Sequence, residues 1–441
     1  MKNSISRRDF FKKTAVTGSG FALGNLLMMN RTLAFSRNYG DVFIQKGRET
    51  LCAVKSTEME KIEQAAAKAA ATLASGKNIY SEVTIGHMMF QETNNDRIGN
   101  PGIFKTLPRE ASNPPEVYQA MQPGDFFIAN YPHQYCLDAH KRGVYVVGVT
   151  SPFVPDKNSG DYVNPWAEGY FMTQVSDLVI ESYTPHSEGL VPIPEIPVAP
   201  VFPGSELTLS LIYWMLNAEL ADKIANGNSS KPLEKATEYY NIALQRYDEA
   251  ARQIHTLKDA GANAAERILK GSKFYIYDKR NELVGEASGR ASGLMLTNGI
   301  GPDLKTLKYG DILVIGAYSS DDKQDIDVAK RAREIGAWIV GIGPTGTEGD
   351  TSGERTLKLV DVPLDNRSPD QWGCIPIQGR AEKICPTSGI TNAMLFWSFQ
   401  AHMTGEMIER GAVPYIWMGF HLKGGREYDN AMRPFFMKRG Y

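Results

Sequence analysis

A short pattern occurs twice in this chain of 441 residues, and it restricts the fold more than any other feature of the sequence. Residues 121–130 read MQPGDFFIAN, and residues 307–316 read LKYGDILVIG. Each contains a Gly-Asp turn and then an uninterrupted apolar run, which is typical of a strand buried on both faces of a parallel sheet. Each is followed by a polar loop, a stretch with helical periodicity that ends at a glycine, and a second Val/Ile-rich run. The pattern therefore predicts matching strand–helix–strand units at 124–149 and 310–342.

The correspondence extends in both directions along the chain. Further matches pair 70–80 with 264–275, and 203–214 with 386–397. Four correspondences in the same order predict an internal duplication.

The predicted fold class is α/β, with two pseudo-symmetric, flavodoxin-like domains. Each is expected to be an open parallel sheet with helices on both faces. We place the domains at 48–228 and 233–441, joined by the polar segment 226–232. In sheets of this kind, ligands bind beyond the carboxyl ends of the strands.

The first 34 residues have the features of an export signal. Arg7 and Arg8 follow Ser6 and precede a mildly apolar run at 14–29, and the small residues up to Ala34 suit a signal peptidase. We predict a twin-arginine signal peptide at 1–34 and a periplasmic or otherwise exported protein. The alternative is an amphipathic N-terminal helix with a chance arginine pair. The apolar run is too short and too rich in Gly and Thr to be a stable membrane span.

The overall composition excludes several partners and cofactors. With 48 basic and 50 acidic residues, the chain is not expected to bind nucleic acid or an anionic membrane surface. The four cysteines show no CxxC pair and no metal-ligand spacing, so we predict no metal and no cofactor. Free, buried cysteines are favoured slightly, although a disulfide is chemically allowed in an exported protein.

The ordered set of segments resembles the SIS (sugar isomerase) domain family. Segments 310–320 and 336–342 follow that family's order of Gly-Asp, strand, Ser-containing loop, Gly-Ala and second strand. A subgroup of small bacterial SIS proteins has Gly-His, Glu and Arg after its first strand. Matching residues here are Gly86, His87, Glu92 and Arg97 in the first half and Glu286 and Arg290 in the second. The resemblance covers nearly all of the chain after residue 34 and implies a sugar or sugar-derivative ligand.

The chain departs from the family at the loop that would hold a phosphate. In the second half, Ser319 and Ser320 remain but Asp321 and Asp322 follow, and the loop of the first half has no hydroxyl besides that of Tyr131. A carboxylate within about 5 Å of a phosphate costs on the order of a few kcal/mol at an effective dielectric near 20. We therefore expect neutral or amino sugars to bind better than their phosphates.

Candidate catalytic residues follow from the chemistry of aldose–ketose interconversion, which needs a base for the C1–C2 proton transfer and an acid/base to open the ring. Glu92 and Glu286 occupy corresponding places, and either could be the base if apolar surroundings raise its pKa. The alternative is that they pair with Arg97 and Arg290 at the domain interface. His87, which is equally compatible with packing under a loop, and His421 are the other catalytic candidates.

Candidate substrate-binding residues lie in the loops near the predicted strand ends. Hydroxyls, guanidinium groups and aromatic rings there could bind a sugar; the Tyr rings could stack on its apolar face, as could Tyr135 and Trp166. Thr387 and Ser388 could instead only cap the helix that follows. The candidates are Arg97, Tyr131, His133, Arg290, Tyr318, Ser319, Ser320, Thr387 and Ser388.

Three functional hypotheses remain open from the sequence. The first is an exported tandem SIS-domain protein that isomerises a sugar, and retention of Glu and Arg in both halves favours it. The second is a non-catalytic carbohydrate-binding protein, which the eroded loops favour. The third is a structural partner in an envelope assembly. The sequence is also compatible with a homo-oligomer.

Overall fold

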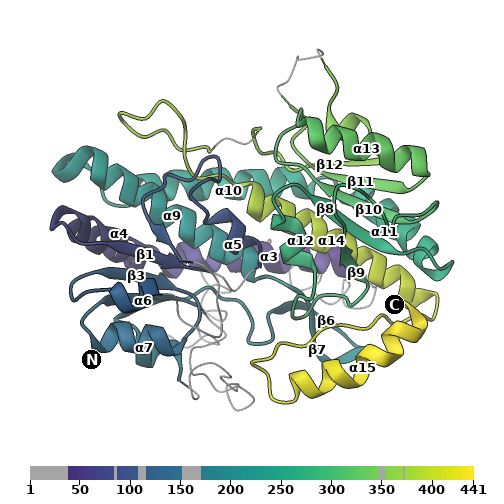
Figure 1. Cartoon of the computed structure of the whole chain (residues 1–441), viewed down its shortest axis with the longest axis horizontal. Helices are drawn as coiled ribbons and strands as arrows, with labels where there is room; N and C mark the ends of the chain where they lie inside the picture. Colours follow the sequence, from purple (N-terminus) through teal and green to yellow (C-terminus); the bar gives the residue numbers. More distant parts are fainter. Residues whose placement is uncertain (1–37, 84–86, 108–115, 151–169, 347–352, 371–372) are drawn as a thin grey trace, which may run out of the picture.

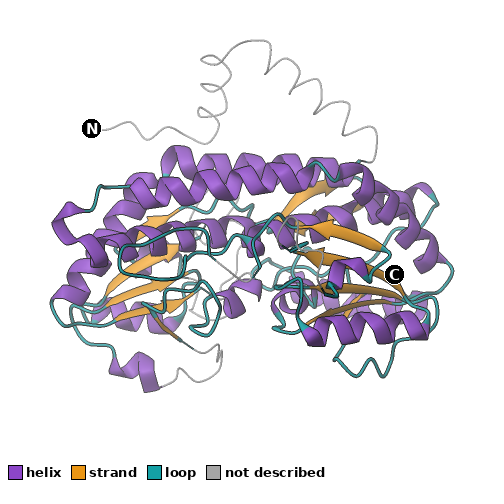
Figure 2. Cartoon of the chain, turned by 90° about the horizontal axis from the view of Figure 1, so that it is seen from above, coloured by secondary structure: helices purple, strands orange, loops and turns teal. Residues whose placement is uncertain are grey.

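The computed structural model describes residues 38–83, 87–107, 116–150, 170–346, 353–370 and 373–441. It has an α/β architecture with two separate parallel sheets, which confirms the predicted fold class. The sheets lie at opposite ends of the molecule, with helices packed around them (Figure 2). The predicted signal peptide, 1–34, and Trp166 lie outside the described residues.

The two sheets share the same strand order. In the first sheet the order is β2 (Lys105–Thr106), β1 (Ile79–Glu82), β3 (Phe126–Ala129), β4 (Tyr145–Val149) and β5 (Leu178–Ile180). In the second sheet the corresponding order is β9 (Thr297–Gly299), β8 (Phe274–Asp278), β10 (Ile312–Gly316), β11 (Trp338–Gly343) and β12 (Val362–Asp365). Every strand pair within these sheets is parallel.

The aspartate of each Gly-Asp turn explains why the pattern recurs. Asp125 accepts hydrogen bonds from the backbone N–H of Asn78 at 2.9 Å and of Gln122 at 2.8 Å. Asp311 accepts from the N–H of Lys273 at 2.8 Å and of Lys308 at 2.9 Å. In each half, one carboxylate closes the turn and ties it to the start of the neighbouring strand. Both side chains are buried, where such charged hydrogen bonds are strongest.

The two predicted strand–helix–strand units are present. Helix α7 (Gln134–Lys141) joins β3 to β4, and α13 (Lys323–Ile335) joins β10 to β11. Gly143 and Gly336 follow these helices with φ of 85° and 84°, a left-handed conformation that favours glycine. The predicted domain limits, 48–228 and 233–441, stay predictions.

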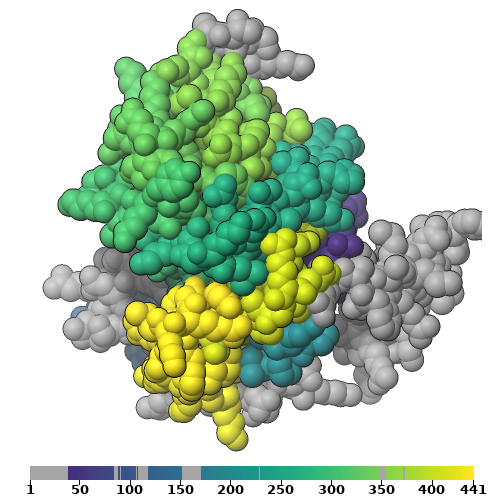
Figure 3. Space-filling model, turned by 90° about the vertical axis from the view of Figure 1, so that its right-hand side faces the viewer, coloured from purple at the N-terminus to yellow at the C-terminus, as the bar shows by residue number. Residues whose placement is uncertain are grey.

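The remaining elements cover the sheets and fill the space between them. They are α3 (Tyr39–Thr57), α4 (Met59–Ala74), α5 (His87–Glu92), α6 (Glu116–Ala120), α8 (Met172–Val175), β6 (Gly189–Ile193), β7 (Ile196–Pro203), α9 (Ser205–Asn226), η2 (Gly227–Ser229), α10 (Glu234–Ala251), α11 (Ile254–Leu269), α12 (Glu282–Ala287), η3 (Thr356–Lys358), α14 (Ser388–Glu409) and α15 (Gly425–Arg439). Strands β6 and β7 form an antiparallel hairpin. The C-terminal helix α15 lies on the outside of the molecule, where most of its residues are exposed (Figure 3).

Helices α9 and α14 run through the middle of the molecule (Figure 1) and are buried on nearly all sides. A helix that is apolar around its whole circumference has to be surrounded by protein. One hydrophobic core includes both helices together with residues of both sheets, among them Ile79 and Phe274. The sheets are therefore two, but their main core is shared.

His402 shows how closely the central helices pack. Its ring lies on α14 between Gly40 of α3 and Gly261 of α11, where an added Cβ would come within 2.2 Å and 2.7 Å of His402 atoms. Burial lowers the pKa of His402 to about 4, against the opposing effect of Asp41. No helix in the described part of the chain is both long and apolar enough to cross a membrane.

Candidate functional site

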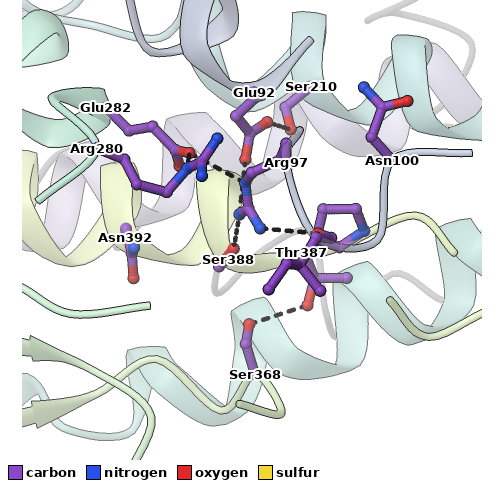
Figure 4. A network of polar contacts seen from close by, with 12 residues as sticks. Glu92, Arg97, Asn100, Ser210, Arg280, Glu282, Ser368, Thr387, Ser388 and Asn392 are labelled. Carbon is purple, nitrogen blue, oxygen red and sulfur yellow. Dashed lines mark hydrogen bonds and ion pairs between the residues drawn. The ribbon is translucent and has the colours of Figure 1, made fainter. Parts of the chain in front are cut away.

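Arg97, from the first half, contacts residues at the carboxyl end of the second sheet. Its Nη2 donates to Ser388 Oγ at 2.6 Å, at the start of α14, and its Nε lies 3.0 Å from Glu282 Oε1, at the start of α12 (Figure 4). Its Nη2 is 3.7 Å from Glu92 Oε1. The guanidinium carbon lies 5.1 Å from the centre of the Tyr318 ring, in the loop after β10.

Arg290 makes the reciprocal contact from the second half to the first. Its guanidinium donates to Ser205 Oγ, at the start of α9, and lies 2.5 Å from Glu188 Oε2. Its Nε is 3.6 Å from Glu286 Oε2. Both arginines are almost completely buried, and each reaches the long central helix that belongs to the other half. The two halves are thus joined by a crossed pair of arginines.

The carboxylates beside these arginines are held by tryptophans. Glu92 Oε2 accepts from Ser210 Oγ at 2.8 Å and from Trp214 Nε1 at 3.2 Å, and Glu286 Oε1 accepts from Trp397 Nε1 at 2.8 Å. Both carboxylates are fully buried. They therefore occupy the interface position that the sequence left as the alternative to a catalytic role. A role in proton transfer stays a prediction.

Burial also changes the acidity of these groups. It raises the pKa of Glu92 to about 7, with Arg97 opposing the shift and Glu282 adding to it. It raises the pKa of Glu286 as well, against the effect of Arg290. A neighbouring carboxyl, Glu206, accepts from the backbone N–H of Met89 at 3.1 Å, and its pKa is raised well above the usual range by burial and by Glu92 and Glu286. These three carboxyls are thus weaker acids than exposed carboxyls are.

The loop after β10 holds the two predicted serines, but its donors are engaged by carboxylates of the chain itself. The N–H of Ser320 donates to Asp370 Oδ1 at 2.5 Å, and the Ser320 hydroxyl donates to Oδ2 at 2.9 Å. The hydroxyl of Ser319 donates to Asp321 Oδ1 at 2.5 Å. Asp322 caps α13 by accepting from the N–H groups of residues 324 and 325. The hydroxyls of Ser319 and Ser320 and the N–H of Ser320 therefore all donate to carboxylates of the protein.

The corresponding loop after β3 is aromatic. His133 lies with its ring centre 4.7 Å from that of Tyr131 and 4.6 Å from that of Tyr135, and Tyr135 stacks on Tyr118 at 4.0 Å. The Tyr135 hydroxyl donates to Glu82 Oε1 at 2.6 Å, and His133 Nε2 is 3.7 Å from the same oxygen. The predicted residues Tyr131 and His133 thus lie next to each other in the first half. Ser319 and Ser320 belong to the second half, in the loop after β10.

Thr387 is positioned by side chains rather than by helix capping. It is the N-cap of α14 but makes no side-chain cap hydrogen bond. Arg246 Nη1 donates to the Thr387 hydroxyl at 2.7 Å, and Ser368 Oγ lies 3.0 Å from it. Ser388 thus contacts Arg97, while its neighbour Thr387 contacts Arg246 and Ser368.

Several buried polar atoms near these hydroxyls have no hydrogen-bond partner among the described residues, and the uncharged ones include Tyr318 Oη and Asn392 Nδ2. Asn392 lies one turn after Ser388 on α14, so both face the same side, and its Oδ1 accepts from Asn366 at 2.8 Å. Each of these two atoms could therefore take a further polar partner.

The remaining catalytic candidates are placed as follows. His87 is the first residue of α5. His421 Nε2 contacts the carbonyl oxygen of His186 at 2.8 Å, and the two rings are nearly perpendicular. His186 precedes Glu188, the partner of Arg290, so His421 helps to position that segment. In the described part of the chain, no group of three or more His, Cys, Asp or Glu side chains could hold a metal ion, and all four cysteines are free.

Sequence reasoning missed several residues of this region, namely Glu82, Glu188, Glu206, Glu282, Asn366, Asp370 and Asn392. Glu82 ends the first strand of its sheet, and that position alone could have singled it out. The others lie on helices or loops distant in sequence from their partners and carry no local signal.

Comparisons with known proteins agree with the fold. A candidate phosphosugar isomerase of Clostridium difficile 630 has a TM-score of 0.50 at 9% identity, over 84% of this chain and 94% of its own. A candidate sugar-binding protein of Salmonella typhimurium LT2 has a TM-score of 0.45 at 12% identity, over 82% of this chain and 98% of its own. The chain has the SIS-type fold that the sequence predicted.

Sequence relatives match a shorter stretch. A UPF0309 protein of Shouchella clausii (strain KSM-K16) is 25% identical over 133 residues, which are 29% of this chain and 54% of the relative. A UPF0309 protein of Listeria monocytogenes is 25% identical over 137 residues, 30% of this chain and 58% of the relative. The chain thus spans about half the length of these relatives. No family model matches the chain.

Proposed function

We propose that this chain is an exported protein that binds a sugar or sugar derivative at the carboxyl end of the second sheet, where Arg97 crosses from the first half. The observation that carries the proposal is the pair of buried, unpartnered polar groups, Tyr318 Oη and Asn392 Nδ2, beside the hydroxyls of Thr387 and Ser388. Sugar hydroxyls both donate and accept hydrogen bonds. They could therefore accept from Asn392 Nδ2 and either donate to or accept from Tyr318 Oη.

A variant that removes only the unpartnered hydroxyl tests this site. Because Tyr318 Oη has no partner among the described residues, Tyr318→Phe should leave the melting temperature of the free protein unchanged or slightly higher. Thermal-shift screening of the wild type against neutral, amino, acidic and phosphorylated sugars should identify a stabilising class. Tyr318→Phe should then lose most of that stabilisation.

Tyr309→Phe is the matched control, because Tyr309 is 87% exposed and far more accessible than Tyr318. It should respond to the sugar as the wild type does. Failure of every sugar class to raise the melting temperature, or an unchanged response of Tyr318→Phe, would contradict the proposed site.

The export part of the proposal rests on the sequence around Arg7 and Arg8. Conservative replacement of both by lysine keeps the charge but removes the residues that the export machinery reads. The double variant should remain unprocessed in the cytoplasm, whereas the wild type should be found outside it without residues 1–34. Cell fractionation and mass measurement show where each variant is found and whether it is processed. Normal export of the double variant would refute this part of the proposal.

Aldose–ketose isomerisation is the second candidate function, and one observation favours it. The pKa of Glu92 is raised to about 7, and a general base works best when its pKa lies near the operating pH. Incubation of the stabilising sugar with the protein, followed by NMR detection of the ketose, tests for turnover. Turnover that persists in Glu92→Gln would exclude Glu92 as the base, and absence of turnover in the wild type would leave the binding function alone.

A further inference from the structure

The loop after β10 is built like an oxyanion-binding site. Ser320 presents a backbone N–H and a hydroxyl toward the same point, between the end of a buried strand and the start of α13. Adjacent N–H and O–H donors in this position are a general means of binding anions in parallel α/β proteins. Ser320 is fully buried, so its two donors need partners.

Asp370 supplies both partners. Its two carboxylate oxygens each take one donor of Ser320, at 2.5 Å and 2.9 Å, as two oxygens of a phosphate would. Asp370 lies 50 residues further along the chain, after the last strand of the sheet. An anion is therefore already present at this point, and it is part of the protein.

The surrounding charges reinforce this arrangement. Asp321 takes the hydroxyl of Ser319, and its Oδ2 lies 3.5 Å from Arg355 Nη1. Asp322 is 2.7 Å from the Lys279 ammonium. Arg355 and Lys279 are thus each paired with a carboxylate, and a phosphate placed here would approach three negative side chains.

We propose that Asp370 sets the specificity of the sugar site against phosphorylated ligands, because its carboxylate fills the oxyanion position that Ser320 defines. A phosphorylated ligand binds at this loop only when the carboxylate is removed. The inference rests on the proposed function for the sugar part of the ligand, but the oxyanion position itself does not depend on it.

The test is a gain of binding. Inorganic phosphate is titrated into the full-length mature protein by isothermal calorimetry at constant ionic strength. Asp370→Ala should bind phosphate at least about tenfold more tightly than the wild type, a difference of about 1.4 kcal/mol. Ser320→Ala introduced into Asp370→Ala should return the affinity to that of the wild type, because it removes one of the two donors.

Asp303→Ala is the matched control. It removes one negative charge at an exposed position paired with Lys305, before β10, and should bind phosphate no better than the wild type. An equal gain in this variant would attribute the effect to net charge and would overturn the proposal.

If Asp370→Ala is less stable than the wild type, its thermal unfolding is measured with and without phosphate. Phosphate should then raise the melting temperature of Asp370→Ala more than that of the wild type, and the isosteric Asp370→Asn should respond to an intermediate extent. The proposal would be overturned if Asp370→Ala folded, bound phosphate no more tightly than the wild type and gained no more thermal stability from phosphate than the wild type does. So would tight phosphate binding by the wild type that depends on Ser320. Failure of every unphosphorylated sugar class to bind the wild type would count against the proposed function, whereas the phosphate results would still decide the role of Asp370.

Discussion

The two halves of the molecule share a scaffold and differ at the carboxyl ends of their strands. The strand order is the same, and Asp125 and Asp311 make the same pair of backbone hydrogen bonds. The loop after β3, however, packs His133 among tyrosine rings, whereas the loop after β10 consists of hydroxyls and carboxylates. The backbone arrangement thus depends on a few turns, and the ligand chemistry depends on the loops.

The crossed arginines show a second difference. Ser205 and Ser388 are corresponding partners of the two arginines, but the next residue is Glu206 in the first half and Gly389 in the second. A Cβ at Gly389 would lie 2.1 Å from Glu92 Oε1, so glycine makes room for that carboxylate. In the first half the same position adds a further buried carboxyl to the interface. The symmetry of the interface is therefore geometric and not electrostatic.

The largest expected effect compares the two arginines. Arg290→Met leaves both Glu188 and Glu286 without their cation, and removal of one partner of a buried ion pair costs about 3–5 kcal/mol. Arg97→Met should cost less, because Glu282 keeps a second cation, Arg280, at 2.8 Å. Urea denaturation of both variants measures the difference. Equal losses would show that the two halves respond alike despite their different charges.

The two Gly-Asp turns should behave alike. Asp125→Ala and Asp311→Ala each remove an acceptor of two backbone N–H groups, and each should lower the free energy of unfolding by about 3 kcal/mol. The exposed Asp303→Ala should have little effect in the same urea titrations. A difference of more than about 1.5 kcal/mol between the two turn variants would break the structural equivalence of the halves.

The raised pKa of Glu92 predicts a pH dependence of stability. The folded protein keeps the Glu92 proton up to about pH 7, whereas the unfolded chain releases it near the ordinary value of 4.5. The folded state therefore binds more protons in this window, and the free energy of unfolding falls as the pH rises from 4.5 to 7, by on the order of 2–3 kcal/mol. Glu92→Gln should make this part of the curve less steep, while the exposed Glu409→Gln should not; buried Asp278 and Asp325 keep part of the slope. Parallel curves for wild type and Glu92→Gln would contradict the assignment.

The smallest effect compares two tyrosines at the ends of the two sheets. Tyr135→Phe loses the hydrogen bond to Glu82 and should cost about 1–2 kcal/mol, seen as a lower melting temperature. Tyr318→Phe in the other half should cost nothing, since its hydroxyl has no partner among the described residues. If both variants lost the same stability, the hydroxyl of Tyr318 would have a protein partner after all.

The scaffold was predictable from the sequence because its signals are local. A Gly-Asp turn, an apolar run and a glycine after a helix each concern residues close together in the chain, and they located β3, α7 and β4 as well as β10, α13 and β11. Four residues of the interface, Glu92, Glu286, Arg97 and Arg290, were also singled out, through the resemblance. Local pattern and resemblance together were enough for these elements.

The contacts of the site were not predictable in the same way. Arg97 meets Ser388 across 291 positions, and Ser320 meets Asp370 across 50. Such pairs depend on how the helices cross and on which loop returns to the sheet, and neither has a periodicity in the sequence. The contacts of Thr387 with Arg246 and Ser368 are of the same kind, since both partners are distant in the sequence.

Helices α9 and α14 have a consequence for any version of this protein with only one half. Each is buried around nearly its whole circumference, and part of that cover comes from the other half. A single half would present an apolar helix to water, and it would need a second copy of itself to cover it. The full chain therefore contains within one polypeptide an arrangement that a shorter one could reach only as an obligate homodimer, at a cost that depends on its concentration.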